Sequence, residues 1–199
     1  MRNKQQIQQT LTTALALHQA GNINDAVICY QNVLASDPRN VDALRMLGII
    51  CYEHGNPEEA ARLIGLSLKV NARQPHLHNI LGLALHAMQR YDEALKSYDK
   101  AIVLAPDDNH AHGNRGDTLS QMRRYDEALA SYGKAITLTP DDADLYFKRG
   151  IVLRQMNRFD EALASYDQAI ALAPNHTSAY NNKGNVLSHL QRNREISRP

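Results

Sequence analysis

The sequence predicts an all-α protein, built as a solenoid of antiparallel helix pairs. The segment Tyr91–Pro106 (YDEALKSYDKAIVLAP) returns almost unchanged as Tyr125–Pro140 and again as Phe159–Pro174, so its copies start at a constant spacing. The same spacing relates five glycines and five alanines: Gly48, Gly82, Gly116, Gly150 and Gly184, and Ala26, Ala60, Ala94, Ala128 and Ala162. A fixed period of about 34 residues is typical of repeat architectures.

The recurring glycine, taken as position 8 of each repeat, sets the boundaries along the chain. The repeats are 7–40, 41–74, 75–108, 109–142 and 143–176, followed by a partial or capping helix at 177–190, with tails at 1–6 and 191–199. We expect residues 7–190 to form a single domain. Stacked repeats bury a continuous core that no single repeat can cover.

Each full repeat is predicted to form a helix, a turn and a second helix. In the repeat 75–108, apolar residues recur at helical spacing over 77–85 and again over 94–102, and Met88–Arg90 turns the chain between them. Asp92 and Glu93 suit the start of the second helix, where exposed N–H groups and the helix dipole favour carboxylates. Pro106 ends that helix, because proline cannot continue it.

The recurring small residues have a packing role. Two helices joined by a short turn fold back with their axes about 8–10 Å apart. We expect Gly82 on the first helix and Ala94 on the second to permit that approach. The partial helix at 177–190 fits two interpretations equally: a polar cap for the array, or the front of a repeat in a longer protein.

Composition excludes several classes of protein. With 43% hydrophobic residues and a formal net charge of +1, the chain can bury a core and carries no strong field for nucleic acid or an acidic membrane. Cys29 and Cys51 are too few for a disulfide framework. No apolar run approaches the ~18 residues of a membrane span, and no secretory signal opens the chain, so a cytoplasmic location is expected.

The repeated positions resemble the tetratricopeptide repeat (TPR) family. The match lies at Leu81-Gly82, Ala94, Tyr98, Ala101 and Pro106, in order and spacing. The first two repeats depart from this pattern, with Ala14 in place of the glycine, and Ile64 and Ala72 in place of the aromatic residue and the proline. The resemblance implies a right-handed superhelical solenoid, a TPR array, whose first helices line a concave groove that binds peptides or partner helices.

First-helix positions that would face this groove supply candidate partner-binding residues. They are Arg45, Ile49, His76, Asn79, Leu83, His110, Asn114, Asp117, Phe147, Lys148, Ile151 and Asn182. The front of the groove is more apolar, and the rear carries amides and mixed charge. This composition suits an extended or helical segment whose backbone is held by Asn114 and Asn182. The lysine, asparagine and arginine set with which some members clamp chaperone tails is missing, so that ligand is disfavoured.

Histidines and basic residues invite two further interpretations, which we disfavour. His76 and His78, like His110 and His112, lie two apart on a helix and point in different directions, so we expect no metal site. Arg115, Arg149 and Lys183 form a short basic row at position 7, which nearby aspartates offset, so we expect no nucleic-acid binding.

The sequence offers no catalytic motif and no cofactor-binding loop. We therefore predict a non-catalytic scaffold for protein–protein interaction, with a protein or peptide ligand and no cofactor. The alternative is the substrate-recognition portion of a larger bacterial glycosyltransferase related to the O-linked N-acetylglucosamine transferases, because Ser97–Ile102 and Asn181–Gly184 are similar to the repeats of those proteins. A third interpretation is self-association through the ends of the array.

Overall fold

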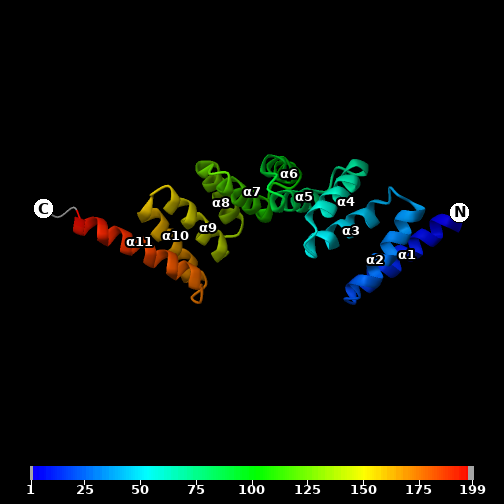
Figure 1. Ribbon diagram of the computed structural model, residues 1–199, viewed down its shortest axis with the longest axis horizontal. Helices are drawn as coiled ribbons and strands as arrows, with labels where there is room; N and C mark the ends of the chain where they lie inside the picture. The colour runs from blue at the N-terminus through cyan, green and yellow to red at the C-terminus, as the bar shows by residue number, and fades with distance from the viewer. Residues whose placement is uncertain (1, 197–199) are drawn as a thin grey trace. The chain divides into compact units, whose positions relative to one another are not determined.

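The computed structural model describes residues 2–196, with side chains from residue 4 to residue 193, and all the regular structure in this part is helical. The helices are α1 (Arg2–Gln19), α2 (Ile23–Ser36), α3 (Val41–Glu53), α4 (Pro57–Val70), α5 (Pro75–Ala87), α6 (Tyr91–Leu104), α7 (Asn109–Gln121), α8 (Tyr125–Leu138), α9 (Ala143–Gln155), α10 (Phe159–Leu172) and α11 (Thr177–Ile196) (Figure 1). The predicted all-α fold is confirmed.

The helix starts follow the predicted repeats, and the ends of the chain do not. Helices α3, α5, α7, α9 and α11 begin at the first residues predicted for their repeats. Helix α1, however, begins at Arg2, so residues 2–6 extend it and form no separate tail. Helix α11 likewise continues through residues 191–196, which were also expected as a tail.

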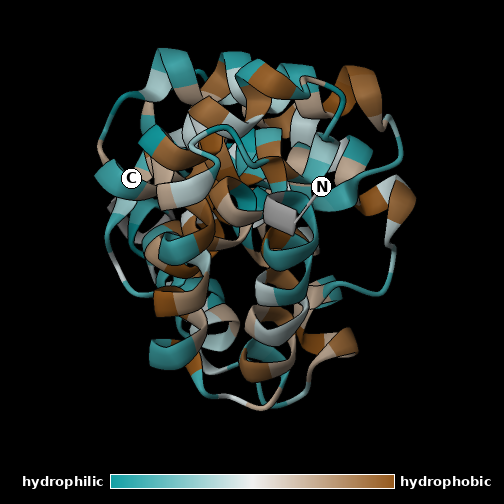
Figure 2. Cartoon of the chain, turned by 90° about the vertical axis from the view of Figure 1, so that its right-hand side faces the viewer, coloured by the Kyte–Doolittle hydropathy of each residue, from teal (hydrophilic) through white to brown (hydrophobic). Residues whose placement is uncertain are grey.

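The chain divides into two compact bodies, residues 1–104 and residues 105–199. The N-terminal body pairs α1 with α2, α3 with α4 and α5 with α6. The C-terminal body pairs α7 with α8 and α9 with α10, and α11 packs against α10 and α9. The helices carry bands of both hydrophobic and hydrophilic residues (Figure 2), as expected of helices that turn an apolar side toward their neighbours. The expectation of one domain over residues 7–190 stays a prediction.

The turn within each pair uses one residue in the left-handed region of backbone space. It is Gly21 or Gly55 in the first two repeats, with φ of 79° and 75°, and Gln89, Arg123 or Asn157 in the next three, with φ of 59°, 57° and 57°. The predicted turn at Met88–Arg90 is therefore confirmed, with Gln89 as its strained residue.

The glycine at position 8 admits an aromatic ring from the second helix of the same repeat. A Cβ atom added to Gly116 would lie 2.7 Å from Cε1 of Tyr132, and one added to Gly150 would lie 2.6 Å from Cε1 of Tyr166. Gly82 faces the ring of Tyr98 in the same way. The absence of a side chain at Gly82 thus admits this ring, and Ala94 on the second helix is fully buried, in agreement with the packing role expected for both.

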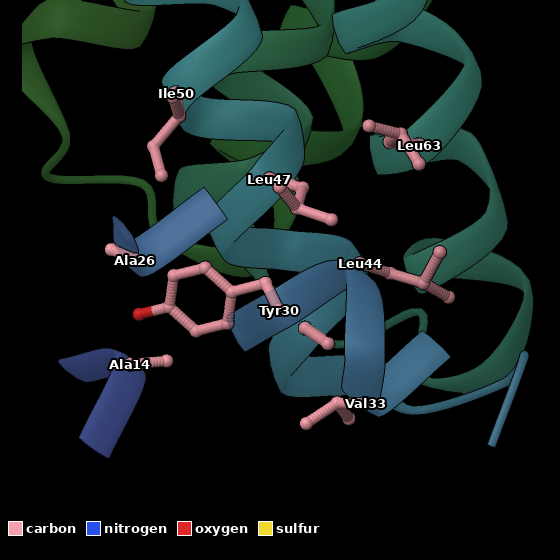
Figure 3. Packing of buried hydrophobic residues seen from close by; sticks show 9 residues of the cluster. Ala14, Ala26, Tyr30, Val33, Leu44, Leu47, Ile50 and Leu63 are labelled. Atoms are coloured by element: carbon pink, nitrogen blue, oxygen red, sulfur yellow. The ribbon is translucent and has the colours of Figure 1, made fainter. Parts of the chain in front are cut away.

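In the first repeat, position 8 is an alanine, Ala14, and it also packs against a tyrosine of the second helix. Tyr30 lies between Ala14 and Ala26, with Leu44, Leu47 and other apolar residues completing the cluster (Figure 3). The exposed fraction of Tyr30 is 1%, so its ring is as buried as those of the later repeats. A tyrosine at this position therefore forms the core of a helix pair whether position 8 is glycine or alanine.

Candidate partner-binding face

The first helices of neighbouring repeats lie side by side within each body. Contacts join α3 to α5 in the N-terminal body, and α7 to α9 and α9 to α11 in the C-terminal body. We call the surface formed by positions 2, 5, 6, 9 and 12 of these helices and of α1 the first-helix face. It holds all twelve candidate residues predicted from the sequence.

In the N-terminal body, this face is hollowed into a pocket of about 210 Å³ between α1, α2 and α3. The lining residues are Gln8, Leu11, Thr12, Leu15, Tyr30, Asp42, Arg45 and Met46. The guanidinium of Arg45 donates to the carboxylate of Asp42 at 3.0 Å, one turn away on the same helix. The Tyr30 hydroxyl is buried and has no hydrogen-bond partner. The pocket therefore combines apolar side chains with polar ones, including an ion pair.

The other four candidates in this body differ in their accessibility. Ile49 packs against the core cluster that contains Ile64, and Leu83 packs against the cluster that contains Tyr98. Asn79 has an exposed fraction of only 6%. His76 is exposed. A bound segment would thus meet His76 and Arg45 more readily than Asn79.

In the C-terminal body, an ion pair and a hydrogen bond converge on Asp117. The hydroxyl of Tyr132 donates to Oδ1 of Asp117 at 2.7 Å, and Nζ of Lys148 donates to Oδ2 at 2.7 Å. Burial raises the pKa of Tyr132 far above its ordinary value, and the charge of Asp117 raises it further. Asp117 and Lys148 are therefore brought together as predicted for one face, but each already has a partner inside the protein.

The remaining candidates in this body differ in their contacts and in their exposure. The ring of Phe147 lies 4.7 Å from that of His176, centroid to centroid. The side-chain amide of Asn182 donates to the carbonyl of Ser178 at 2.9 Å, so its donor is used within α11. His110 is exposed, and Asn114 and Ile151 are half-buried.

A second pocket borders this face through Arg154 and Asn185, and Arg154 is a residue that the sequence-based candidates missed. It measures about 310 Å³ and is lined by Arg154, Asn157, Phe159, Asn185, Val186 and His189. Nε of Arg154 is buried and has no hydrogen-bond partner. The available signal was its place at position 12 of the first helix, which spacing alone assigns to this face. We call this site the Arg154 pocket.

The basic row at position 7 has a structural explanation. Arg115 donates to Oγ of Ser131 at 2.7 Å, and Arg149 donates to Oγ of Ser165 at 3.1 Å. Lys183 reaches Asp167 at 2.5 Å. Each contact joins a first helix to a second helix, so these cations connect neighbouring helices within the C-terminal body.

Two of the four paired histidines hold the linkers between repeats. Nε2 of His78 lies 2.9 Å from the carbonyl oxygen of Ala72, and Nε2 of His112 lies 3.0 Å from that of Pro106. Burial lowers the pKa of His78, although its backbone hydrogen bond opposes the shift. Among the described residues, no three histidine, cysteine, aspartate or glutamate side chains gather as a metal site would require.

Over residues 2–196, none of the helices combines the length and the apolar character that crossing a membrane would demand.

Family models described as tetratricopeptide repeat match nearly the whole chain. One model matches residues 11–71, 114–176 and 147–194, and a second matches residues 74–141. Tetratricopeptide repeat protein 8 of Caenorhabditis elegans is 31% identical over 101 residues, which are 50% of this chain and 20% of that protein.

Solved structures of similar proteins show the same fold. MamA superposes with a TM-score of 0.77 at 24% identity, over 80% of this chain and 93% of that one. YrrB, described as having an unusual peptide-binding site, superposes with a TM-score of 0.80 at 23% identity, over 88% of this chain and 90% of that one. At these identities the likeness concerns the fold.

Proposed function

The chain belongs to the tetratricopeptide repeat family, and from this premise we propose that it is a non-catalytic scaffold that binds a peptide or helix of a partner protein on its first-helix face. The observation that carries the proposal is that this face is hollowed into a pocket in the N-terminal body and borders a second pocket in the C-terminal body. Both pockets combine apolar side chains with polar groups, which is the composition of a site that fixes a segment in one orientation.

The two pockets suit different ligand side chains. The N-terminal pocket offers Leu11, Leu15 and Met46 as apolar contacts, and the exposed fraction of Leu15 is 45%. The Arg154 pocket offers a guanidinium and an amide from Asn185, which suit polar ligand groups. The similarity to YrrB, whose structure is described by its peptide-binding site, is consistent with this mode of binding.

An affinity capture with matched variants tests the proposal. Arg45 and Asn182 make their side-chain bonds within their own helices, to Asp42 and Ser178. The double variant Arg45→Ala/Asn182→Ala should therefore keep the fold and lose contacts on the first-helix face of each body. The control is Lys69→Ala/Lys134→Ala, which truncates exposed lysines on second helices.

The readout is mass spectrometry of proteins retained from a lysate of the source cells, after circular dichroism has shown equal helicity. We expect partners retained by the wild type and the control and depleted at least about tenfold by the face variant, which corresponds to about 1.4 kcal/mol of lost binding. Equal retention by all three proteins would refute binding on this face.

A further inference from the structure

The C-terminal body contains one carboxylate that two side-chain donors of the protein hold in place. In the repeat 109–142, the carboxylate of Asp117 lies between the hydroxyl of Tyr132 and the ammonium of Lys148, with both donors at 2.7 Å. The tyrosine contributes a donor from the core, and the lysine contributes a charge from the next first helix. A carboxylate held by two such donors is a strong, charge-assisted arrangement.

The next repeat keeps the tyrosine and lacks the carboxylate, and Asn182 stands at the place of Lys148. Tyr166 occupies the place of Tyr132 one repeat later, while Ile151 occupies the place of Asp117. The Tyr166 hydroxyl is buried, finds no acceptor for its proton, and lies beside the side chain of Arg154. The residue that accepts this hydrogen bond in the repeat before is replaced by an apolar side chain.

The cation near this hydroxyl is Arg154. Burial raises the pKa of Tyr166, and the positive charge of Arg154 and a hydrogen bond from its side chain partly oppose that rise. Nε of Arg154 is itself buried without a hydrogen-bond partner. No described carboxylate forms an ion pair with Arg154, whereas Lys148 and Lys183 pair with Asp117 and Asp167. A buried donor on a cation without an acceptor is costly, and a bound anion removes that cost.

The Arg154 pocket supplies further donors and an apolar wall. Asn185 contributes a side-chain amide, and Phe159 and Val186 contribute the apolar surface. The ring of His189 lies 5.0 Å from that of Phe159, centroid to centroid. Nδ2 of Asn193 donates to Nε2 of His189 at 3.1 Å, which leaves the proton of the neutral imidazole on Nδ1, as a donor.

We propose that the Arg154 pocket binds the side-chain carboxylate of an acidic residue in the partner segment, with the guanidinium of Arg154 as its main contact and Asn185 and His189 as flanking donors. This inference rests on the proposed function and names the chemistry of the partner. The pocket volume of about 310 Å³ accommodates a glutamate side chain, and the apolar wall suits its methylene groups. The Asp117 carboxylate, which is held by a tyrosine and a cation in the preceding repeat, shows the kind of contact that the bound carboxylate would make.

A titration followed by nuclear magnetic resonance tests this site without knowledge of the partner. The probes are the α-amide of N-acetylglutamate, whose only charge is the side-chain carboxylate, the α-amide of N-acetylglutamine as its neutral isostere, and inorganic phosphate, each added up to about 50 mM because single-residue ligands bind weakly. The two amides are called N-acetylglutamate and N-acetylglutamine below. Resonances of the Arg154 Nε–H group and the Asn185 amide report occupancy. The variants are Arg154→Gln and, as a control with the same loss of charge in the same body, Arg123→Gln in an exposed turn.

We expect N-acetylglutamate to shift both resonances with saturation, and N-acetylglutamine to bind at least about tenfold more weakly, because a hydrogen bond to a charged group is worth about tenfold or more in affinity. In the Arg154→Gln variant, the Asn185 shifts should be lost, while Arg123→Gln should leave them unchanged. Three results would each overturn the proposal: equal binding of the two probes, binding retained by Arg154→Gln, or tighter binding of phosphate than of N-acetylglutamate.

The two proposals fail separately. A negative titration together with loss of partners by the Arg45→Ala/Asn182→Ala variant leaves the first-helix face as the binding surface and removes its preference for acidic residues. A positive titration together with equal partner capture leaves the carboxylate site and removes the segment-binding function.

Discussion

Two glycines at the same position of neighbouring repeats should respond in opposite ways to the same substitution. Gly150 and Gly184 both occupy position 8 of a first helix in the C-terminal body. A Cβ atom on Gly150 would lie 2.6, 2.8 and 3.1 Å from three ring atoms of Tyr166, whereas a Cβ atom on Gly184 would have no neighbour within 4 Å.

The expected magnitudes follow from these contacts. Alanine is favoured over glycine within a helix by about 0.8–1.0 kcal/mol, which applies to both sites. At Gly150, overpacking against a fully buried ring costs about 1–3 kcal/mol and outweighs that gain. We therefore expect Gly150→Ala to lower the free energy of unfolding by up to about 2 kcal/mol, and Gly184→Ala to raise it by up to about 1 kcal/mol.

Thermal unfolding followed by circular dichroism measures the pair, since about 1 kcal/mol shifts the midpoint by about 2–4 °C in a chain of this size. A double-mutant cycle tests whether the Tyr166 ring causes the loss of stability. In the Tyr166→Ala background, Gly150→Ala should no longer destabilise the protein, because the ring that the added methyl group would meet is gone. If Gly150→Ala and Gly184→Ala shift the midpoint equally, or if the cost at Gly150 persists without the ring, the role of the ring is refuted.

Three further outcomes are expected. Asp117→Leu should lower the free energy of unfolding by about 1–3 kcal/mol, because the buried Tyr132 hydroxyl loses its acceptor; an unchanged urea midpoint would contradict this. For His78, whose folded pKa lies below its ordinary value of 6.5, stability is full above that value and is lost as pH falls below it, because the unfolded state binds the proton more readily. Wild type should therefore lose stability relative to His78→Leu in melts at successively lower pH, and parallel pH profiles would show that burial of this ring has no effect. Asn56→Ala should cost about 1 kcal/mol, because the Asn56 side chain caps α4, whereas Asn22→Ala should change little, because the Asn22 side chain makes no capping bond; equal midpoints would contradict the assignment.

Much of the fold was readable in the sequence because repetition multiplies each local signal. The constant period of the repeats located the starts of α3, α5, α7, α9 and α11, since every repeat presents the same turn and the same apolar spacing. The ends of the chain lacked this support. Residues 2–6 are polar and residues 191–196 contain one apolar residue, Ile196, so neither segment carries a periodic apolar pattern, yet they continue α1 and α11.

The candidate site was predictable as a surface and less so as a set of contacts. Helical spacing assigned the first-helix face, but it did not show that Asp117 and Lys148 are paired with each other, because they come from different repeats. Spacing likewise could not show that Asn79 is almost fully buried. Arg154 was missed because an unpaired cation is recognised only when all its neighbours are known.

The sequence by itself therefore determined the helices, the turns and the pairing of helices within repeats, all of which depend on residues close together in the chain. The tertiary structure decided which partners the side chains have. It showed that the ring of Tyr98 packs against Gly82, and that the basic row joins neighbouring helices. The physical reason is that hydrogen bonding and charge pairing depend on distances of a few ångströms between helices, and sequence periodicity does not contain those distances.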